Sequence, residues 1–362
     1  MAALIIILAI SILIQGYFWH FVFRLASHKI PLTRREYETA PSFLSVVICF
    51  HKPWEKLPAV LQNLSRQSYL NFELVLVNDG PVDMESDLLD TYITENDFVR
   101  YIEHHKTSPG KKHALFTGIK AAREKWIVVT DIDCRPGQHW LTTLAAYLPS
   151  HPAVVLGFSP YQIRSGLLNF IIQQETLLTA FQYLGWAKAG HPYMGVGRNM
   201  AAHKSIYEEV TFDGHLHIPT GDDDLFVNEA AERFPVYICN DRASFVYSHP
   251  ASSWKAWYRQ KARHNSGGKY YSWSSKIRLA IFILTLMIEK IILGWFLFTR
   301  IDLFLIFVAL KAIATVGPLR QLYRKFDQES NFWKMWLYEW IHIIYLTLVT
   351  PYIFLISRKQ WD

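Results

Sequence analysis

The chain has 362 residues, of which 51% are hydrophobic and only 19% are charged. Soluble domains contain about 25% charged residues, so this composition argues against a disordered chain and against a small disulfide-bonded scaffold. The formal net charge of +6 fits nucleic acid, an anionic membrane surface or a phosphorylated substrate as partner. The three cysteines lie far apart, in or beside apolar runs, and we expect free thiols in a reducing compartment.

The N-terminal segment predicts a transmembrane helix. Residues 1–23 contain no Lys, Arg, Asp or Glu, and this run is long enough to cross a hydrocarbon core of about 30 Å. A cleaved signal peptide is the competing interpretation, but no positive residue precedes the run and no small-residue cleavage site ends it. We expect an uncleaved anchor over residues 1–24.

Three further apolar stretches lie in the C-terminal third, at 279–298, 303–316 and 336–356, and tryptophans edge them as at membrane interfaces. We therefore expect about three C-terminal transmembrane helices in a membrane region over residues 276–362. Glu289 and Lys290 would then have to face protein and not lipid. The alternative is a buried helical subdomain of a soluble protein.

Positive residues predict the orientation. They follow the first stretch and lie again between the third and the fourth, and cytoplasmic loops carry such an excess of Lys and Arg. We expect a multi-pass protein of the cytoplasmic (inner) membrane whose large polar segment is cytoplasmic. Arg358 and Lys359 fall on the opposite side if all four stretches cross, so the number of crossings stays open.

The polar segment predicts an α/β fold. Short apolar runs rich in β-branched residues at 43–50, 72–79, 125–133 and 154–160 alternate with segments of helical periodicity. Such alternation indicates a mostly parallel, Rossmann-like sheet with helices on both faces. We place this domain at residues 42–250 and expect a further helix up to about Tyr183.

Polar residues follow three of these strands, which is where ligands bind in open α/β sheets. They are His51 and Lys52, then Asn78, Asp79 and Gly80, and then Asp131 and Asp133. The two carboxylates of Asp131-x-Asp133 point to the same side of an extended chain and suit Mg²⁺ or Mn²⁺ together with a substrate diphosphate.

The segment that begins at Gly110 opens a helix whose N-terminus and lysines Lys111 and Lys112 could hold phosphate. It is not a Walker A loop, because Lys112 stands where Ser or Thr is required, and this disfavours a nucleoside triphosphatase. A solvated helix start is the alternative for these lysines.

Three carboxylates in Gly221-Asp222-Asp223-Asp224 precede an apolar helix. Like charges so close raise one another's pKa, which makes them candidates for a general base. His215-x-His217 has no third ligand at a sensible spacing, so we do not expect a zinc site there. Residues 251–275 include a basic, aromatic helix that fits the membrane interface.

Taken in order, these motifs resemble the family 2 glycosyltransferases with a GT-A fold. The likeness is to the membrane-embedded bacterial branch that includes cellulose, hyaluronan and poly-N-acetylglucosamine synthases, and it spans roughly residues 43–271. The resemblance implies that Asp79 contacts the nucleobase, that Lys111 binds the donor, and that Asp131 and Asp133 hold nucleotide and metal, with Asp133 the closer metal ligand. It also implies that the segment 192–205 lies on the acceptor side.

The family's catalytic aspartate corresponds to Asp222 or Asp223. Counting back from Leu225 selects Asp222 and counting forward from Gly221 selects Asp223; we favour Asp222. Gln260, Arg263 and His264 match the family's Q-x-x-R-W element and are expected to bind the donor. His264 replaces its tryptophan, which puts processive synthesis in doubt.

The leading hypothesis is therefore an inverting, metal-dependent glycosyltransferase at the cytoplasmic membrane face. It would use a nucleotide-diphosphate sugar, with UDP-sugar expected, and a lipid-linked or glycan acceptor, in contact with membrane lipids and without nucleic acid. A phosphotransferase or pyrophosphorylase with the same nucleotide site is a second possibility. A catalytically silent, nucleotide-binding membrane subunit of a polysaccharide synthase is the alternative from another class.

Overall fold

The structure is a computed structural model of the chain. It describes residues 1–29, 43–51, 56–80, 91, 93–106, 110–210, 218, 221–328 and 332–348. These residues form two compact units. The helical unit contains those within Met1–His28, Ile163–His191 and Gly268–Ser357, and the sheet unit contains those within Lys29–Gln162 and Pro192–Gly267.

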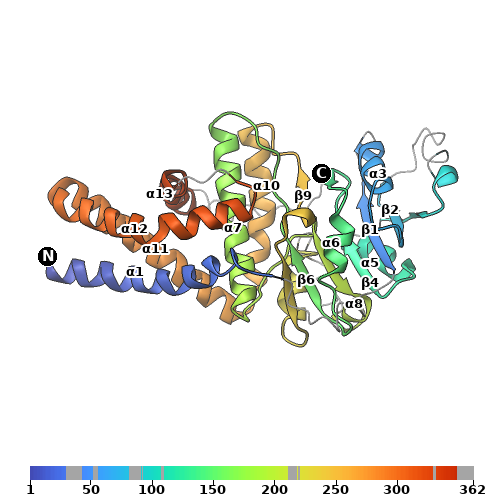
Figure 1. Ribbon diagram of the computed structural model, residues 1–362, viewed down its shortest axis with the longest axis horizontal. Coiled ribbons are helices and arrows are strands. Elements are labelled where there is room, and N and C mark those ends of the chain that lie inside the picture. Colours follow the sequence, from blue (N-terminus) through green and yellow to red (C-terminus); the bar gives the residue numbers. More distant parts are fainter. Residues whose placement is uncertain are drawn as a thin grey trace. The chain divides into compact units, whose positions relative to one another are not determined.

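Within the described residues, a seven-stranded sheet with the order β3-β2-β1-β4-β7-β6-β8 forms the centre of the sheet unit (Figure 1). The strands are β1 (Leu44–Phe50), β2 (Phe72–Asn78), β3 (Val99–Glu103), β4 (Trp126–Val129), β6 (Val154–Gly157), β7 (Met200–His203) and β8 (Val236–Cys239). Strands β3, β2, β1 and β4 are parallel, whereas β7 is antiparallel to both of its neighbours, β4 and β6. The predicted mostly parallel sheet is confirmed.

The remaining elements of the sheet unit cover or extend this sheet. The helices are α3 (Leu57–Ser65), α5 (Lys112–Ala121), α6 (Trp140–Ala145), α8 (Lys204–Glu209), α9 (Asp224–Ala230) and α10 (Trp254–Ser266), with a 3₁₀ turn at Arg242–Ser244 and another that begins at Gly267 (Gly267–Tyr270). Strands β5 (Cys134–Pro136) and β9 (Val246–Ser248) form a separate antiparallel pair. This pair fixes the chain directly after Asp133.

The two faces of the sheet follow from the alternation of side chains along each strand. On one face, Val46 of β1 belongs to the same apolar core as Leu61 of α3. On the other, α5 lies so close that a Cβ atom at Gly118 would stand 2.7 Å from methyl carbons of Val47 and Val77. Both faces of β1 and β2 are thus buried, which explains their continuous apolar sequences.

The register brings the predicted polar strand ends to one edge. Phe50 pairs with Asn78, and Val47 pairs with Val129, so the residues that follow β1, β2 and β4 leave the same side of the sheet. This edge is where the sequence predicted a site.

The helical unit consists of long helices, three of which could cross a membrane by length and composition. Its helices are α1 (Ala2–Phe23), α7 (Leu167–Lys188), α11 (Trp273–Thr299), α12 (Ile301–Lys325) and α13 (Phe332–Leu348). Among the described residues, α1, α11 and α12 qualify as spans. The described residues thus provide two C-terminal candidate spans where the sequence predicted about three; α13 has 17 described residues, and the rest of the stretch 336–356 lies outside them.

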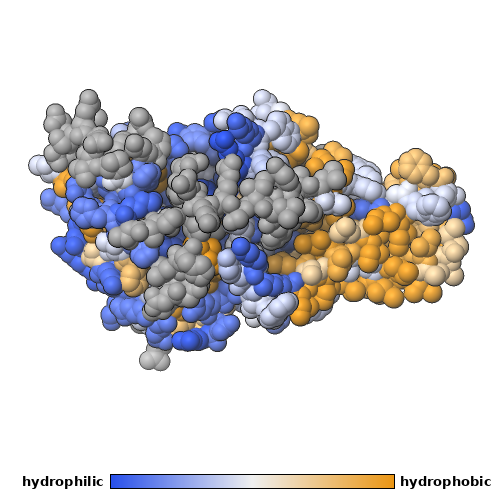
Figure 2. Space-filling model, turned by 180° about the vertical axis from the view of Figure 1, so that it is seen from behind, coloured by the Kyte–Doolittle hydropathy of each residue, from blue (hydrophilic) through white to orange (hydrophobic). Residues whose placement is uncertain are grey.

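The surface of these helices is apolar. Side chains such as Leu13, Phe298 and Ile313 are more than 70% exposed, and Figure 2 shows hydrophobic surface gathered over this unit. Such extended apolar surface is rare on soluble proteins and fits a lipid environment.

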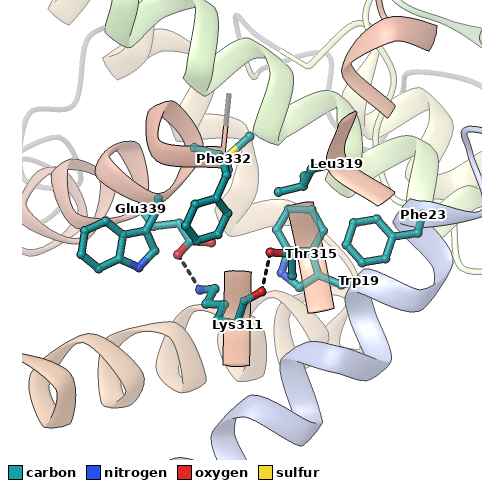
Figure 3. Close-up of a pocket in the computed structure, with 9 residues that line it drawn as sticks. Trp19, Phe23, Lys311, Thr315, Leu319, Phe332 and Glu339 are labelled. Carbon is teal, nitrogen blue, oxygen red and sulfur yellow. Dashed lines mark hydrogen bonds and ion pairs between the residues drawn. The ribbon is translucent and has the colours of Figure 1, made fainter. Parts of the chain in front are cut away.

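Four charged side chains, three buried and one (Lys311) partly buried, nevertheless meet between α11, α12 and α13. Lys290 Nζ lies 2.8 Å from Glu289 Oε1 and 2.5 Å from Glu339 Oε2, and Lys311 Nζ lies 2.8 and 2.7 Å from the same two atoms. The prediction that Glu289 and Lys290 face protein is confirmed. In Figure 3, Lys311 and Glu339 point toward one another beside the aromatic side chains of Trp19, Phe23 and Phe332.

Candidate active site

Lys111 joins two of the predicted acidic motifs. It is the residue before α5, and its Nζ lies 2.9 Å from Asp131 Oδ1 and 3.0 Å from Asp222 Oδ2. Asp131 follows β4 and Asp222 precedes α9, so residues far apart in sequence meet at the carboxyl edge of the sheet.

Electrostatics keep this cluster charged. Burial alone would lower the pKa of Lys111, but the carboxylates of Asp131, Asp222 and Asp223 outweigh it, and the pKa stands well above 10.5. Burial would raise the pKa of Asp131, yet Lys111, with Arg198 and Arg263 further away, lowers it. Lys111 is therefore an ammonium at neutral pH.

Asp131 and Asp133 could hold a divalent cation. Their carboxylate oxygens and the Cys134 sulfur lie within 4.8 Å of one another. Burial raises the pKa of the Cys134 thiol to about 12, so the sulfur stays protonated and is a poor ligand for a hard cation. Asp133 also lies 3.5 Å from Lys56 Nζ. Two partly exposed carboxylates with room for substrate oxygens are the donor set that Mg²⁺ and Mn²⁺ use.

The two candidates for the general base have different surroundings. Asp222 is paired with Lys111. Asp223 caps α9, where Oδ2 accepts a 2.7 Å hydrogen bond from Gly197 N and Oδ1 accepts one of 2.8 Å from Asp224 N. Burial, followed by the charge of Asp222, raises the pKa of Asp223 against the lowering effect of Lys111 and these hydrogen bonds.

Asp79 lies directly after β2 and is buried. Its Oδ2 is 2.8 Å from Lys106 Nζ, its Oδ1 is 3.9 Å from His104 Nε2, and its backbone oxygen is 2.8 Å from His51 Nδ1. Asp79 thus lies at the same sheet edge as Asp131, but it is paired with a different lysine, Lys106. Its contact with a nucleobase stays a prediction.

Helix α10 carries the predicted Gln260, Arg263 and His264. Gln260 Nε2 donates a 2.9 Å hydrogen bond to the Tyr161 hydroxyl. Desolvation by surrounding side chains lowers the pKa of His264 well below 6.5, and nearby cations lower it further; these are Lys261, Arg263, Arg198 and Lys111. His264 is nevertheless exposed to solvent by its surface area. The imidazole is neutral at pH 7.

Sequence reasoning missed Arg198, Tyr161 and Thr130. Arg198 lies inside the segment 192–205, two residues before β7, and Thr130 Oγ1 donates a 2.8 Å hydrogen bond to its carbonyl oxygen. A single positive residue within a run of small and apolar ones was the only available signal. Lys112 is buried, with a pKa lowered to about 8 chiefly by that burial, and is not the solvated residue of the alternative interpretation. Lys52, His215 and His217 lie outside the described residues.

Comparison with known proteins shows what the segment around this site is similar to. Residues 45–211 match the family model described as glycosyl transferase family 2. That segment runs from the second residue of β1 past β7 and includes Asp79, Lys111, Asp131 and Asp133.

Two bacterial relatives agree with this match. Glycosyltransferase GlyG of Streptococcus pneumoniae is 27% identical over 115 residues, 32% of this chain and 38% of that protein. Probable glycosyltransferase YdaM of Bacillus subtilis is 26% identical over 278 residues, 71% of this chain and 62% of that protein. The chain thus spans less than two thirds of the length of either relative.

A solved structure shares the fold over most of the chain. Mannosyltransferase PcManGT from Pyrobaculum calidifontis, in complex with GDP-Man and Mn²⁺, is 15% identical with a TM-score of 0.56, and the match covers 94% of this chain and 99% of that chain. At this identity the likeness establishes the fold alone.

Proposed function

This chain carries a family 2 glycosyltransferase domain with a GT-A fold, and from that premise we propose that it transfers a sugar from a nucleotide-diphosphate sugar to an acceptor hydroxyl. The observation that carries the proposal is the position of Lys111 between Asp131 and Asp222. It joins the carboxylates suited to donor and metal with the acidic motif suited to a general base.

The donor would lie along the carboxyl edge of the sheet, with its nucleobase near Asp79 and its diphosphate near Asp131 and Asp133. UDP-sugar is the donor class that we expect, although GDP-Man and Mn²⁺ accompany the mannosyltransferase of the same fold. A bound Mg²⁺ or Mn²⁺ would supply positive charge against the leaving diphosphate. Lys111 and Arg263 would add charge to the same end.

The acceptor hydroxyl would lose its proton to a carboxylate of the acidic motif. The sequence favoured Asp222, but its pairing with Lys111 leaves it less available as a base. Asp223 has the raised pKa that brings a carboxylate nearer to the pH at which a base operates. We assign the base to Asp223, and attack from the face opposite the leaving group would invert the anomeric carbon.

The acceptor would be a glycan or lipid-linked molecule at the membrane. Three helices long enough to span a bilayer and the exposed Trp254 at the start of α10 support this location. The positive residues after the first span favour the inner membrane, with the sheet unit cytoplasmic.

The test is product analysis. Membranes that contain the chain are incubated with a panel of radiolabelled UDP- and GDP-sugars and Mn²⁺, and lipid and glycan fractions are identified by mass. We expect a glycosidic product from one donor, its loss in Asp133→Asn, and its retention in Asp241→Asn, an aspartate that caps the Arg242–Ser244 turn. Donor binding without any product would instead support the silent subunit, and a triphosphate product would support a pyrophosphorylase.

A further inference from the structure

We propose that Arg198 binds the diphosphate of the donor, and that Tyr161 and Gln260 position its guanidinium. The inference rests on the proposed function and assigns a residue outside the D-x-D, acidic and Q-x-x-R motifs. It also gives Gln260 an indirect role, through Tyr161, in place of direct donor binding.

The backbone of Arg198 is fixed next to the metal-binding carboxylates. Thr130, the residue before Asp131, donates its hydroxyl hydrogen to the Arg198 carbonyl oxygen at 2.8 Å. The next residue, Asn199, is fully buried and hydrogen-bonded to the carbonyl oxygens of Phe158 and Ser244. These hydrogen bonds therefore fix the backbone of Arg198 relative to the end of β4.

Its guanidinium is held in one orientation by neutral groups. Nη1 donates to the Ser248 hydroxyl, Nη2 donates to the Ser159 carbonyl oxygen at 3.3 Å, and the guanidinium carbon lies 4.4 Å from the centre of the Tyr161 ring. These two hydrogen bonds use two of the five N–H groups of an arginine. The planar group keeps further donors for a bidentate partner.

Lys111 and Lys56 are each close to a carboxylate, whereas Arg198 is not. Those two lysines form ion pairs with Asp131, Asp222 or Asp133. In the part of the chain that the structure describes, no carboxylate lies within 4.0 Å of the Arg198 guanidinium, although its charge interacts at longer range with Asp131 and Asp133. Enclosed charges are normally paired, so this guanidinium lacks the anion that a bound diphosphate would provide.

Tyr161 links Arg198 to α10. Its side chain is 6% exposed, and its hydroxyl accepts the 2.9 Å hydrogen bond from Gln260. The hydrogen bond from Gln260 fixes the Tyr161 ring, and the ring packs against the guanidinium. Gln260 therefore restrains Arg198 indirectly, through Tyr161. A purely structural role is the competing explanation, since Arg198 also ties the Ser159 segment to β9.

Calorimetry on the full-length protein in nanodiscs with Mn²⁺ separates these explanations. The probes are UDP, GDP, their monophosphates and inorganic pyrophosphate. We expect Arg198→Gln to weaken binding of the preferred diphosphate by about 10- to 100-fold, and of its monophosphate clearly less. Arg198→Lys should recover part of the loss. Arg233→Gln, which removes an exposed charge three residues after α9, should bind as the parent does.

The positioning role has its own readout. Tyr161→Phe keeps the ring but removes the hydroxyl, and we expect a two- to fivefold loss of diphosphate affinity that Gln260→Leu in the same protein does not increase. Additive losses would overturn the role of the Gln260–Tyr161 bond. Salt should weaken diphosphate binding less in Arg198→Gln than in the parent, because one cation is gone.

A folded Arg198→Gln protein that keeps the parent's diphosphate affinity and diphosphate-to-monophosphate ratio would overturn the assignment and leave the proposed function standing. An equal loss for diphosphate and monophosphate, together with a lower melting temperature, would show the structural role instead. A parent protein that binds none of the nucleotides would overturn the proposed function and this inference together.

Discussion

Lys111 compensates carboxylates that would otherwise repel one another. Asp131 and Asp222 both lie within 3.0 Å of its ammonium, and no hydroxyl or amide could replace that charge. It thus holds the acidic motifs together, and in the proposed reaction it would also offer positive charge to the leaving group.

Lys111→Met tests this charge. We expect kcat/KM for sugar transfer to fall by about 100-fold or more, because the charge that would stabilise the leaving diphosphate is lost. Lys120→Met, an exposed lysine at the end of the same helix, is the matched control and should keep the parent's rate. Near-normal transfer in Lys111→Met would exclude the role of Lys111.

The pKa of Asp223 predicts the acid limb of the pH profile. A base must be deprotonated, so activity should fall as the pH drops through the raised pKa of Asp223. Asp222→Asn removes the like charge that helps to raise that pKa, so the limb should move to lower pH in this variant. The pH dependence of kcat/KM checks this shift.

Asp223→Asn should abolish transfer at every pH while leaving donor binding intact. The opposite pattern, with activity retained in Asp223→Asn and lost in Asp222→Asn, would return the base to Asp222.

Single residues of the site were predictable to the extent that they belong to motifs. Asp131, Lys111 and Asp222 stand at strand ends or helix starts, where local sequence indicates polar chemistry. Arg198 could not be predicted in this way, because its significance lies in an ion pair that it lacks and in contacts with Ser159, Tyr161 and Ser248, all distant in sequence.

At the scale of elements, the close packing of α5 on the sheet positions Lys111. Lys111 is the residue directly before α5. Gly118, within the same helix, allows α5 to approach β1 and β2 closely. A larger residue there would displace the helix and, with it, the lysine.

Gly118→Val should destabilise the fold by about 2 kcal/mol, since its side chain would overlap Val47 and Val77 in a packed core. The midpoint of thermal unfolding in detergent should fall accordingly. Gly137→Val, at a position where a Cβ atom meets nothing within 4 Å, is the control and should change the midpoint little. Equal midpoints for the two variants would contradict the packing argument.

The buried charges of α11, α12 and α13 hold these helices in register. Lys311→Met would leave Glu289 and Glu339 with one cation between them, and breaking such a buried pair costs about 3–5 kcal/mol. We expect a marked drop in the melting temperature, partly reversed when Glu339→Gln restores the charge balance.

Arg300→Met removes an exposed ion pair with Asp302 at the start of α12 and serves as the control. It should leave the melting temperature unchanged. A similar drop in melting temperature in both variants would mean that the charges around Lys311 stabilise the protein no more than an exposed ion pair does.

Elements were predictable where their own sequence indicates whether they are buried. The apolar strands β1, β2, β4 and β6 and the buried position of Glu289 and Lys290 follow from composition and spacing. The antiparallel insertion of β7 and the assignment of α7 to the helical unit did not follow, because both depend on contacts between distant segments.

For the whole molecule, the apolar excess in the composition has a definite location. The sheet unit is an ordinary α/β domain, and the exposed apolar side chains of α1, α11 and α12 account for the surplus. The positive charges beside these helices and in the site explain why the net charge alone could not distinguish a membrane surface from a phosphorylated substrate.

The anomeric configuration of the product tests the account most directly. Transfer with the donor identified from the panel is followed by NMR of the purified product, in the parent and in Asp223→Asn. We expect one glycosidic linkage with configuration opposite to that of the donor, and no product from the variant. A product that retains the donor's configuration, or that forms equally well without the carboxylate of Asp223, would contradict this expectation.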